Sequence, residues 1–131
     1  MLFHEMMRES IFHMFEDPYI YAFLWAVIVD VLTGFCKSLV TKKSQKKTSS
    51  TKGIAGLVKH LVIMLLVCTS YPLMAAMGYQ IEAKTIVIFY VVFYLVSIIE
   101  NLGQMGLPVP DVIKRHLAKL QDDYDNEGDL K

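Results

Sequence analysis

Hydrophobic residues in this chain gather into three long blocks, 19–40, 54–78 and 85–105, separated by polar segments. An α-helix rises about 1.5 Å per residue, so roughly 20 mostly apolar residues cross the hydrocarbon core of a bilayer. The first two blocks reach that length, and the third reaches it by continuing towards Gly106. The pattern therefore predicts an all-α membrane protein with three transmembrane helices.

A shorter amphipathic segment precedes the first block. In residues 1–18, apolar positions such as Leu2 and Met6 share one face of a helix, and acidic positions take the other. This distribution is typical of a helix that lies on a membrane surface, and a frayed terminus is the alternative. Asp17-Pro18 then ends the helix.

A second amphipathic segment follows the third block. Gly106-Leu-Pro-Val-Pro ends that block, and apolar residues recur at helical spacing beyond Asp111 before an acidic tail. The predicted organisation is an interfacial helix at 1–18, a membrane domain at 19–105, and a cytoplasmic juxtamembrane helix with its tail at 106–131.

Charge is balanced overall, with 13 basic and 13 acidic residues, but it is segregated along the chain. Acidic residues dominate both ends, whereas lysines crowd the loop between the first two blocks. These are Lys37, Lys42, Lys43, Lys46, Lys47 and Lys52. By the positive-inside rule this loop is cytoplasmic, which predicts an outside N-terminus and a cytoplasmic C-terminus.

Each predicted span carries polar residues on one face. They are Asp30, Thr33 and Gly34 in the first, Lys59 and Ser70 in the second, and Tyr90, Tyr94, Ser97, Glu100 and Asn101 in the third. An ionisable group in the bilayer core costs several kcal/mol unless it is paired, hydrated or buried. These stripes therefore either join helices through hydrogen bonds or line water after subunits assemble around a lumen.

Two details of the second span leave alternatives open. Lys59 is placed either to pair with Asp30 or to extend its amine to the cytoplasmic surface. Gly53 and Gly56 either allow close helix approach or mark the turn after the loop. We keep both interpretations for each feature.

Catalytic chemistry has no recognisable basis in the sequence. Cys36 and Cys68 both lie in predicted spans without zinc-site spacing, and the histidines are scattered over different segments. We expect no enzyme activity, no cofactor and no metal. Anionic lipid headgroups are sufficient partners for the lysine loop, so nucleic-acid binding is not expected.

Four short motifs occur in a recognisable order. They are Asp30-Val-Leu-Thr33-Gly34, then Ser49-Ser50-Thr-Lys52-Gly53 with Gly56, then Ser97-Ile98-Ile99-Glu100-Asn101, and finally Gly106-Leu107-Pro108-Val109-Pro110. In order and spacing they resemble the phage holin family that includes the clostridial toxin-secretion holins. The resemblance covers nearly the whole chain from the first span to the tail helix.

The resemblance implies a phage or prophage holin of the host bacterial cytoplasmic membrane. Such proteins form homo-oligomers and open timed lesions that release an endolysin, or large toxins, with an antiholin as a further partner. The chain departs from the pattern at Tyr94, where relatives often carry glutamate, and at Leu73 and Met74, where several carry a carboxylate. A small ion channel or pinholin, an antiholin, and a membrane scaffold subunit are the alternative functions.

Overall fold

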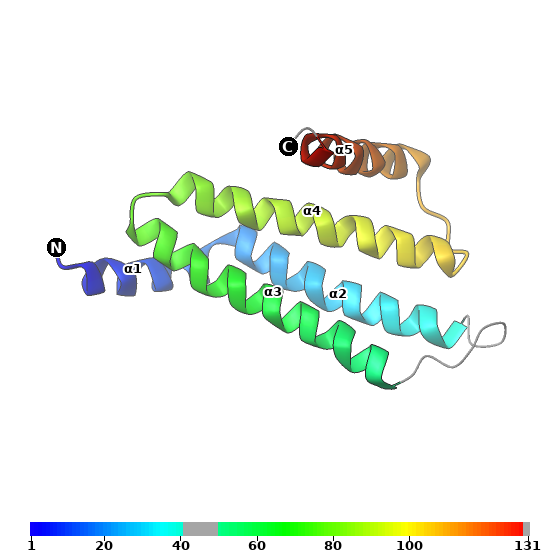
Figure 1. Ribbon diagram of the computed structural model, residues 1–131, viewed down its shortest axis with the longest axis horizontal. Helices are drawn as coiled ribbons and strands as arrows, with labels where there is room; N and C mark the ends of the chain where they lie inside the picture. Colours follow the sequence, from blue (N-terminus) through cyan, green and yellow to red (C-terminus); the bar gives the residue numbers. More distant parts are fainter. Residues whose placement is uncertain (41–49, 130–131) are drawn as a thin grey trace.

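The computed structural model describes residues 1–40 and 50–129, and within these ranges the chain is helical and has no strand (Figure 1). The helices are α1 (Phe3–Glu16), α2 (Pro18–Val40), α3 (Ser50–Ala76), α4 (Gln80–Gln104) and α5 (Asp111–Asp129). Three segments are long and apolar enough to span a membrane: Pro18–Val40, Gly53–Ala76 and Gln80–Gln104. The predicted all-helical fold with three spans is confirmed at this level.

Helix α4 is the centre of the bundle. Both α2 and α3 pack along α4 but make little contact with each other (Figure 1). The buried side chains that join the helices include Phe23 from α2, Val67 from α3, and Val87 and Tyr94 from α4. Because lipid is as apolar as these side chains, close packing and interhelical hydrogen bonds must hold the bundle together in a membrane.

Local sequence explains where the spanning helices begin and end. Asp17 caps α2, because its carboxylate accepts a hydrogen bond of 2.9 Å from the backbone N–H of Tyr19, and Pro18 suits the first helical position. Gly78 and Gly106 have φ values of 93° and 80°, which glycine adopts without steric cost, and they follow α3 and α4. The turn at Gly78 lets α4 start at Gln80, ahead of the predicted span.

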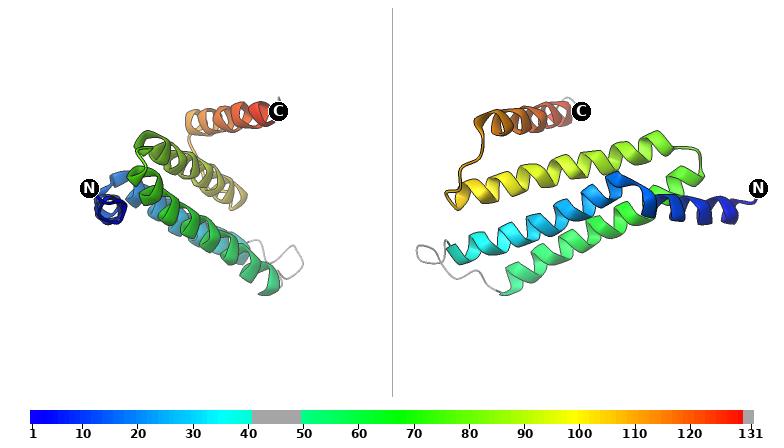
Figure 2. Two further views of the ribbon diagram at one scale, coloured as in Figure 1. Left: turned by 60° about the vertical axis from the view of Figure 1, so that its left-hand side comes forward. Right: turned by 180° about the vertical axis from the view of Figure 1, so that it is seen from behind.

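Two further helices, α1 and α5, flank the three spanning helices, and both contact the bundle. Helix α1 packs against α3, with Met14 buried, and α5 turns back along α4 (Figure 2). Much of the apolar surface of α1, including Phe12 and Phe15, is exposed. The location of α1 and α5 at a membrane surface stays a prediction.

Candidate functional site

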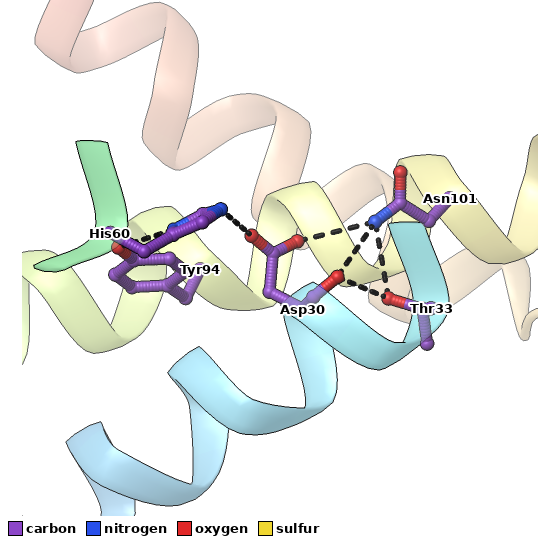
Figure 3. Close-up of polar contacts among 5 residues, drawn as sticks. All are labelled: Asp30, Thr33, His60, Tyr94 and Asn101. Atoms are coloured by element: carbon purple, nitrogen blue, oxygen red, sulfur yellow. Dashed lines mark hydrogen bonds and ion pairs between the residues drawn. The ribbon is translucent and has the colours of Figure 1, made fainter. Parts of the chain in front are cut away.

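A polar network links α2 to α4 within the spanning bundle. The side-chain amide of Asn101 donates to Asp30 Oδ1 at 3.2 Å and to Thr33 Oγ1 at 3.1 Å, and it lies 3.5 Å from the Asp30 carbonyl oxygen (Figure 3). The Thr33 hydroxyl in turn donates to the Asp30 carbonyl at 3.1 Å. One asparagine on α4 therefore joins a carboxylate and a hydroxyl one turn apart on α2.

Helix α3 enters the same network through His60. Its Nε2 lies 3.9 Å from Asp30 Oδ2, an ion pair when the imidazole is protonated, and its Nδ1 shares a hydrogen bond of 3.0 Å with the Tyr94 hydroxyl (Figure 3). A neutral imidazole also fits, with Nε2–H directed at Asp30 and Nδ1 accepting from Tyr94. The site thus accommodates either protonation state of His60 with its partners unchanged.

Burial explains why this network matters for a membrane protein. Asp30 is 6% exposed, Asn101 is 7% exposed and Tyr94 is fully buried. A lone carboxylate at this depth would cost several kcal/mol, whereas a carboxylate with amide and imidazole partners is tolerated. In the described part of the chain, no buried side-chain nitrogen or oxygen lacks a hydrogen-bond partner. The polar groups at the centre of the bundle are therefore hidden from lipid by other helices.

Several residues of the predicted polar stripes meet in this site. Asp30, Thr33, Tyr94 and Asn101 belong to the network, and a Cβ on Gly34 would lie 3.7 Å from Asn101 Nδ2. Because Gly34 has no side chain, the Asn101 amide lies close to the α2 backbone at this position.

The remaining predicted residues lie outside the network. Ser70 bonds the carbonyl of Val67 on its own helix, Tyr90 packs edge-on against Phe23, and Ser97 is half-buried. Lys59 and Glu100 are exposed. Lys42, Lys43, Lys46 and Lys47 fall outside the described residues, as does the side chain of Lys52, whereas Lys37 is half-buried near the end of α2.

His60 is the network residue that sequence reasoning missed. Neighbouring residues on a helix point about 100° apart, so Lys59 and His60 cannot both face Asp30. The structure directs His60 at Asp30 and leaves Lys59 exposed. The available signal in the sequence was that His60 lies at about the same depth in the membrane as Asp30. The adjacent Lys59, with its stronger charge, was the more obvious partner for that aspartate.

A second polar contact, also missed, closes the opposite end of the bundle. The Tyr71 hydroxyl of α3 donates to Asp17 Oδ2 at the junction of α1 and α2, and both residues are buried. The Asp17 carboxylate also caps α2 through Oδ1. The sequence identified Asp17-Pro18 as a helix break but not as a tie to α3.

A groove of about 650 Å³ opens between α2 and α3, beside the polar network and near the end of α2 and the start of α3. Its walls include Phe35 on α2 and Leu57 on α3, and Tyr94 and Asn101 of α4 contribute to its floor. Gly53 and Gly56 line it, and no atom of the described residues lies within 4 Å of a Cβ built on either glycine. These glycines therefore make no close helix contact within one chain.

Comparison with known proteins gives a consistent picture. The family model described as the Bacteriophage holin family matches residues 10–122. An uncharacterized protein of Halalkalibacterium halodurans is 32% identical in an alignment that covers 76% of this chain and 76% of that protein. An uncharacterized protein of Listeria monocytogenes is 28% identical over 67% of this chain and 61% of its own length. One of Clostridium perfringens is 27% identical over 88% of this chain and 81% of its own length. No solved structure matches.

Proposed function

This chain belongs to the bacteriophage holin family, and we propose from that premise that it is a phage or prophage holin. In this proposal it accumulates in the bacterial cytoplasmic membrane, forms homo-oligomers and opens lesions at a set time. The lesions let a cytoplasmic endolysin, or a large toxin, leave the cell. The protein itself carries no enzyme chemistry in this role.

The observation that carries the proposal is the sequestration of Asp30 among three spanning helices. The carboxylate is 6% exposed and meets Asn101 of α4 and His60 of α3, while the outer surface presents large apolar side chains such as Trp25, Leu65 and Phe93. A monomer of this kind is compatible with intact lipid because the carboxylate in the middle of the α2 span is covered by other helices. The spans also contain polar side chains, and these line a water-filled lesion once the helices rearrange.

In this proposal, the time at which lysis begins depends on the free energy with which the subunits associate. In a single chain α2 and α3 share little contact, so the bundle depends on the interfaces that each makes with α4. We propose that subunits at high density exchange part of these internal contacts for contacts between copies. A change of about 1.4 kcal/mol in association free energy alters the equilibrium tenfold, so small differences in packing shift the onset of lysis.

The proposed orientation places the lysine loop and the C-terminal segment in the cytoplasm. The lysines between α2 and α3 support this orientation through the positive-inside rule. We further propose that residues 1–18 rest on the outer surface, that 19–105 form the membrane domain, and that 106–131 form a cytoplasmic helix and tail. The exposed apolar side chains of α1 and the amphipathic sequence of α5 support surface locations.

The test is inducible expression in a bacterium that also produces an endolysin without a secretion signal. Culture turbidity, membrane potential and extracellular endolysin are followed together. We expect growth to continue for a fixed interval and then to stop abruptly, with the endolysin outside the cells. A catalytically dead endolysin provides the control, because the membrane potential should still collapse while the turbidity remains high.

The same experiment separates the alternatives. Depolarisation without release of endolysin would contradict the holin proposal and identify a small channel or pinholin. Continued growth, with the protein confirmed in the membrane, would also contradict it. In that case, this protein would be co-expressed with a functional holin. Lysis later than with that holin alone would identify an antiholin, and unchanged timing would favour a scaffold subunit.

A further inference from the structure

The groove between α2 and α3 lies beside the polar network, and the proposed function leaves its apolar part without a role. It holds about 650 Å³ and is walled by apolar side chains, among them Val31 and Phe35 of α2, Leu57 and Ile63 of α3, and Phe93 of α4. Volumes of this size are typical of small-molecule sites in proteins. In a bilayer such a space cannot stay empty without losing dispersion contacts on both walls, so it needs an occupant.

A flexible acyl chain suits the form of this groove. The groove runs between α2 and α3, with Tyr94 and Asn101 of α4 at its floor. An acyl chain is narrow enough to follow the space between two helices.

The charge beside the groove indicates which kind of lipid headgroup suits it. Lys59 lines the groove and is exposed, about 9 Å of helix beyond Gly53, where the candidate span begins. Among the described residues, the other charged or titratable side chains that line it are Asp30, His60 and Tyr94. Asp30 and His60 lie 3.9 Å apart, and the Tyr94 hydroxyl shares a hydrogen bond with His60. Lys59 therefore leaves a positive charge beside an apolar groove, and a lysine side chain at this depth extends towards the headgroup region.

Further basic residues lie near the groove along the chain. It opens at the end of the bundle where α2 and α3 are joined by the lysine-rich segment. Lys37 lies near the end of α2, and Lys52 belongs to the first turn of α3. Basic sites between spanning helices on the cytoplasmic side favour anionic phospholipid headgroups.

We propose that this groove is a binding site for an anionic phospholipid of the inner leaflet, with one acyl chain between α2 and α3 and the phosphate beside Lys59. The lipid fills the space that α2 and α3 leave between them and lies against the partly exposed imidazole of His60. Inner-leaflet specificity rests on the orientation in the proposed function, whereas the site itself rests on the groove and Lys59.

The test uses the full chain in phosphatidylcholine vesicles that contain a tracer lipid with a photoactivatable acyl chain. The tracer is either phosphatidylglycerol or phosphatidylcholine, and labelled residues are mapped by mass spectrometry. At Leu57 and Ile63 we expect phosphatidylglycerol to label about fivefold more than phosphatidylcholine, the factor contributed by one lysine at a charged surface. At Leu65, which is exposed on α3 outside the groove, the ratio should be near one.

Variants separate the charge from the cavity. Lys59→Gln should bring the ratio at Leu57 close to one, whereas Lys114→Gln, on the exposed surface of α5, should leave it unchanged. Gly56→Leu should remove groove labelling by both tracers, because its side chain enters open space rather than a neighbouring helix. Unchanged labelling at Leu65 then reports that the variants remain folded and inserted.

Three results would overturn the proposal: equal ratios at Leu57 and Leu65, a ratio unaffected by Lys59→Gln, or cross-links from the groove to a second copy in place of lipid. The vesicle experiment contains no endolysin and requires no lysis, and both leaflets carry the tracer. Failure of lipid binding and failure of the holin proposal are therefore seen in separate measurements.

Discussion

Two buried aspartates hold this bundle in different ways. Asp17 lies at the junction of α1 and α2, where it caps α2 and accepts a hydrogen bond from the Tyr71 hydroxyl. Asp30 lies within the α2 span, where it faces the amide of Asn101 and the imidazole of His60. Asp17 is bound by a backbone amide and a phenol, whereas Asp30 is bound by a side-chain amide and faces an imidazole.

This difference assigns different tasks to the two ends of the bundle. The contacts of Asp17 are local to a helix start and one side chain of α3, so they fasten α1, α2 and α3 at one end. The contacts of Asp30 join three helices at the end where α2 and α3 separate around a groove. We infer that the Asp17 end stays closed and that the Asp30 end is where helices rearrange during assembly.

The largest expected effect comes from removing the amide at the Asp30 end. Asn101→Leu deletes the hydrogen bonds that the amide donates to Asp30 and Thr33, and it leaves a buried carboxylate facing an apolar side chain. We expect a loss of about 3 kcal/mol in the free energy of unfolding, measured by chemical unfolding in detergent micelles. Gln104→Leu, at an exposed position on the same helix, is the control and should change stability by less than about 0.5 kcal/mol. Equal losses in both variants would contradict the structural role of the network.

A smaller effect is expected at the Asp17 end. Tyr71→Phe removes the hydroxyl that bonds Asp17 and keeps the ring in place, so we expect a loss of about 2 kcal/mol. The amides of α1 should also exchange hydrogen faster, because the tie between the α1–α2 junction and α3 is gone. Tyr79→Phe alters an exposed hydroxyl and serves as the control. Unchanged exchange in α1 after Tyr71→Phe would show that apolar packing alone holds that helix.

Charge removal within the spans tests timing rather than stability. Asp30→Asn keeps an oxygen acceptor for Asn101 but removes the negative charge that faces His60, and Glu100→Gln removes an exposed charge near the end of α4. We expect both variants to insert normally and to shift the onset of lysis, since a change of about 1.4 kcal/mol in association alters the equilibrium tenfold. Turbidity is followed at matched protein levels. Unchanged timing in both variants would refute a role for these residues in assembly.

The smallest effect is expected at Gly34. A Cβ there would meet Asn101 Nδ2 at 3.7 Å, an ordinary contact, so Gly34→Ala should leave the network intact. Alanine also favours the helix by at most about 1 kcal/mol, which predicts an equal or slightly higher unfolding temperature. The larger Gly34→Leu substitution is the contrast, because its side chain must displace the amide. A marked loss of stability in Gly34→Ala would mean that α2 and α4 tolerate no separation at this position.

Helix positions were largely predictable because they depend on local composition. Long apolar blocks predicted the three spans, Asp17-Pro18 predicted the break before α2, and Gly106 followed by two prolines predicted the end of α4. The start of α4 was less predictable, since the polar residues from Gln80 to Lys84 resemble a turn. Their helical conformation depends on Gly78, whose positive φ reverses the chain in a short distance.

Sequence by itself determined which side chains are costly to expose in lipid, because that cost depends on the chemistry of each residue. Asp30, Thr33, Tyr94 and Asn101 were therefore identifiable as polar residues of the spans. Only the tertiary structure decided their partners, since the choice of His60 over Lys59 depends on how α3 is rotated against α4. The same holds for Tyr71 and Asp17, which are 54 positions apart in the chain. Helix rotation and register arise from the packing of many side chains at once, and no local pattern encodes them.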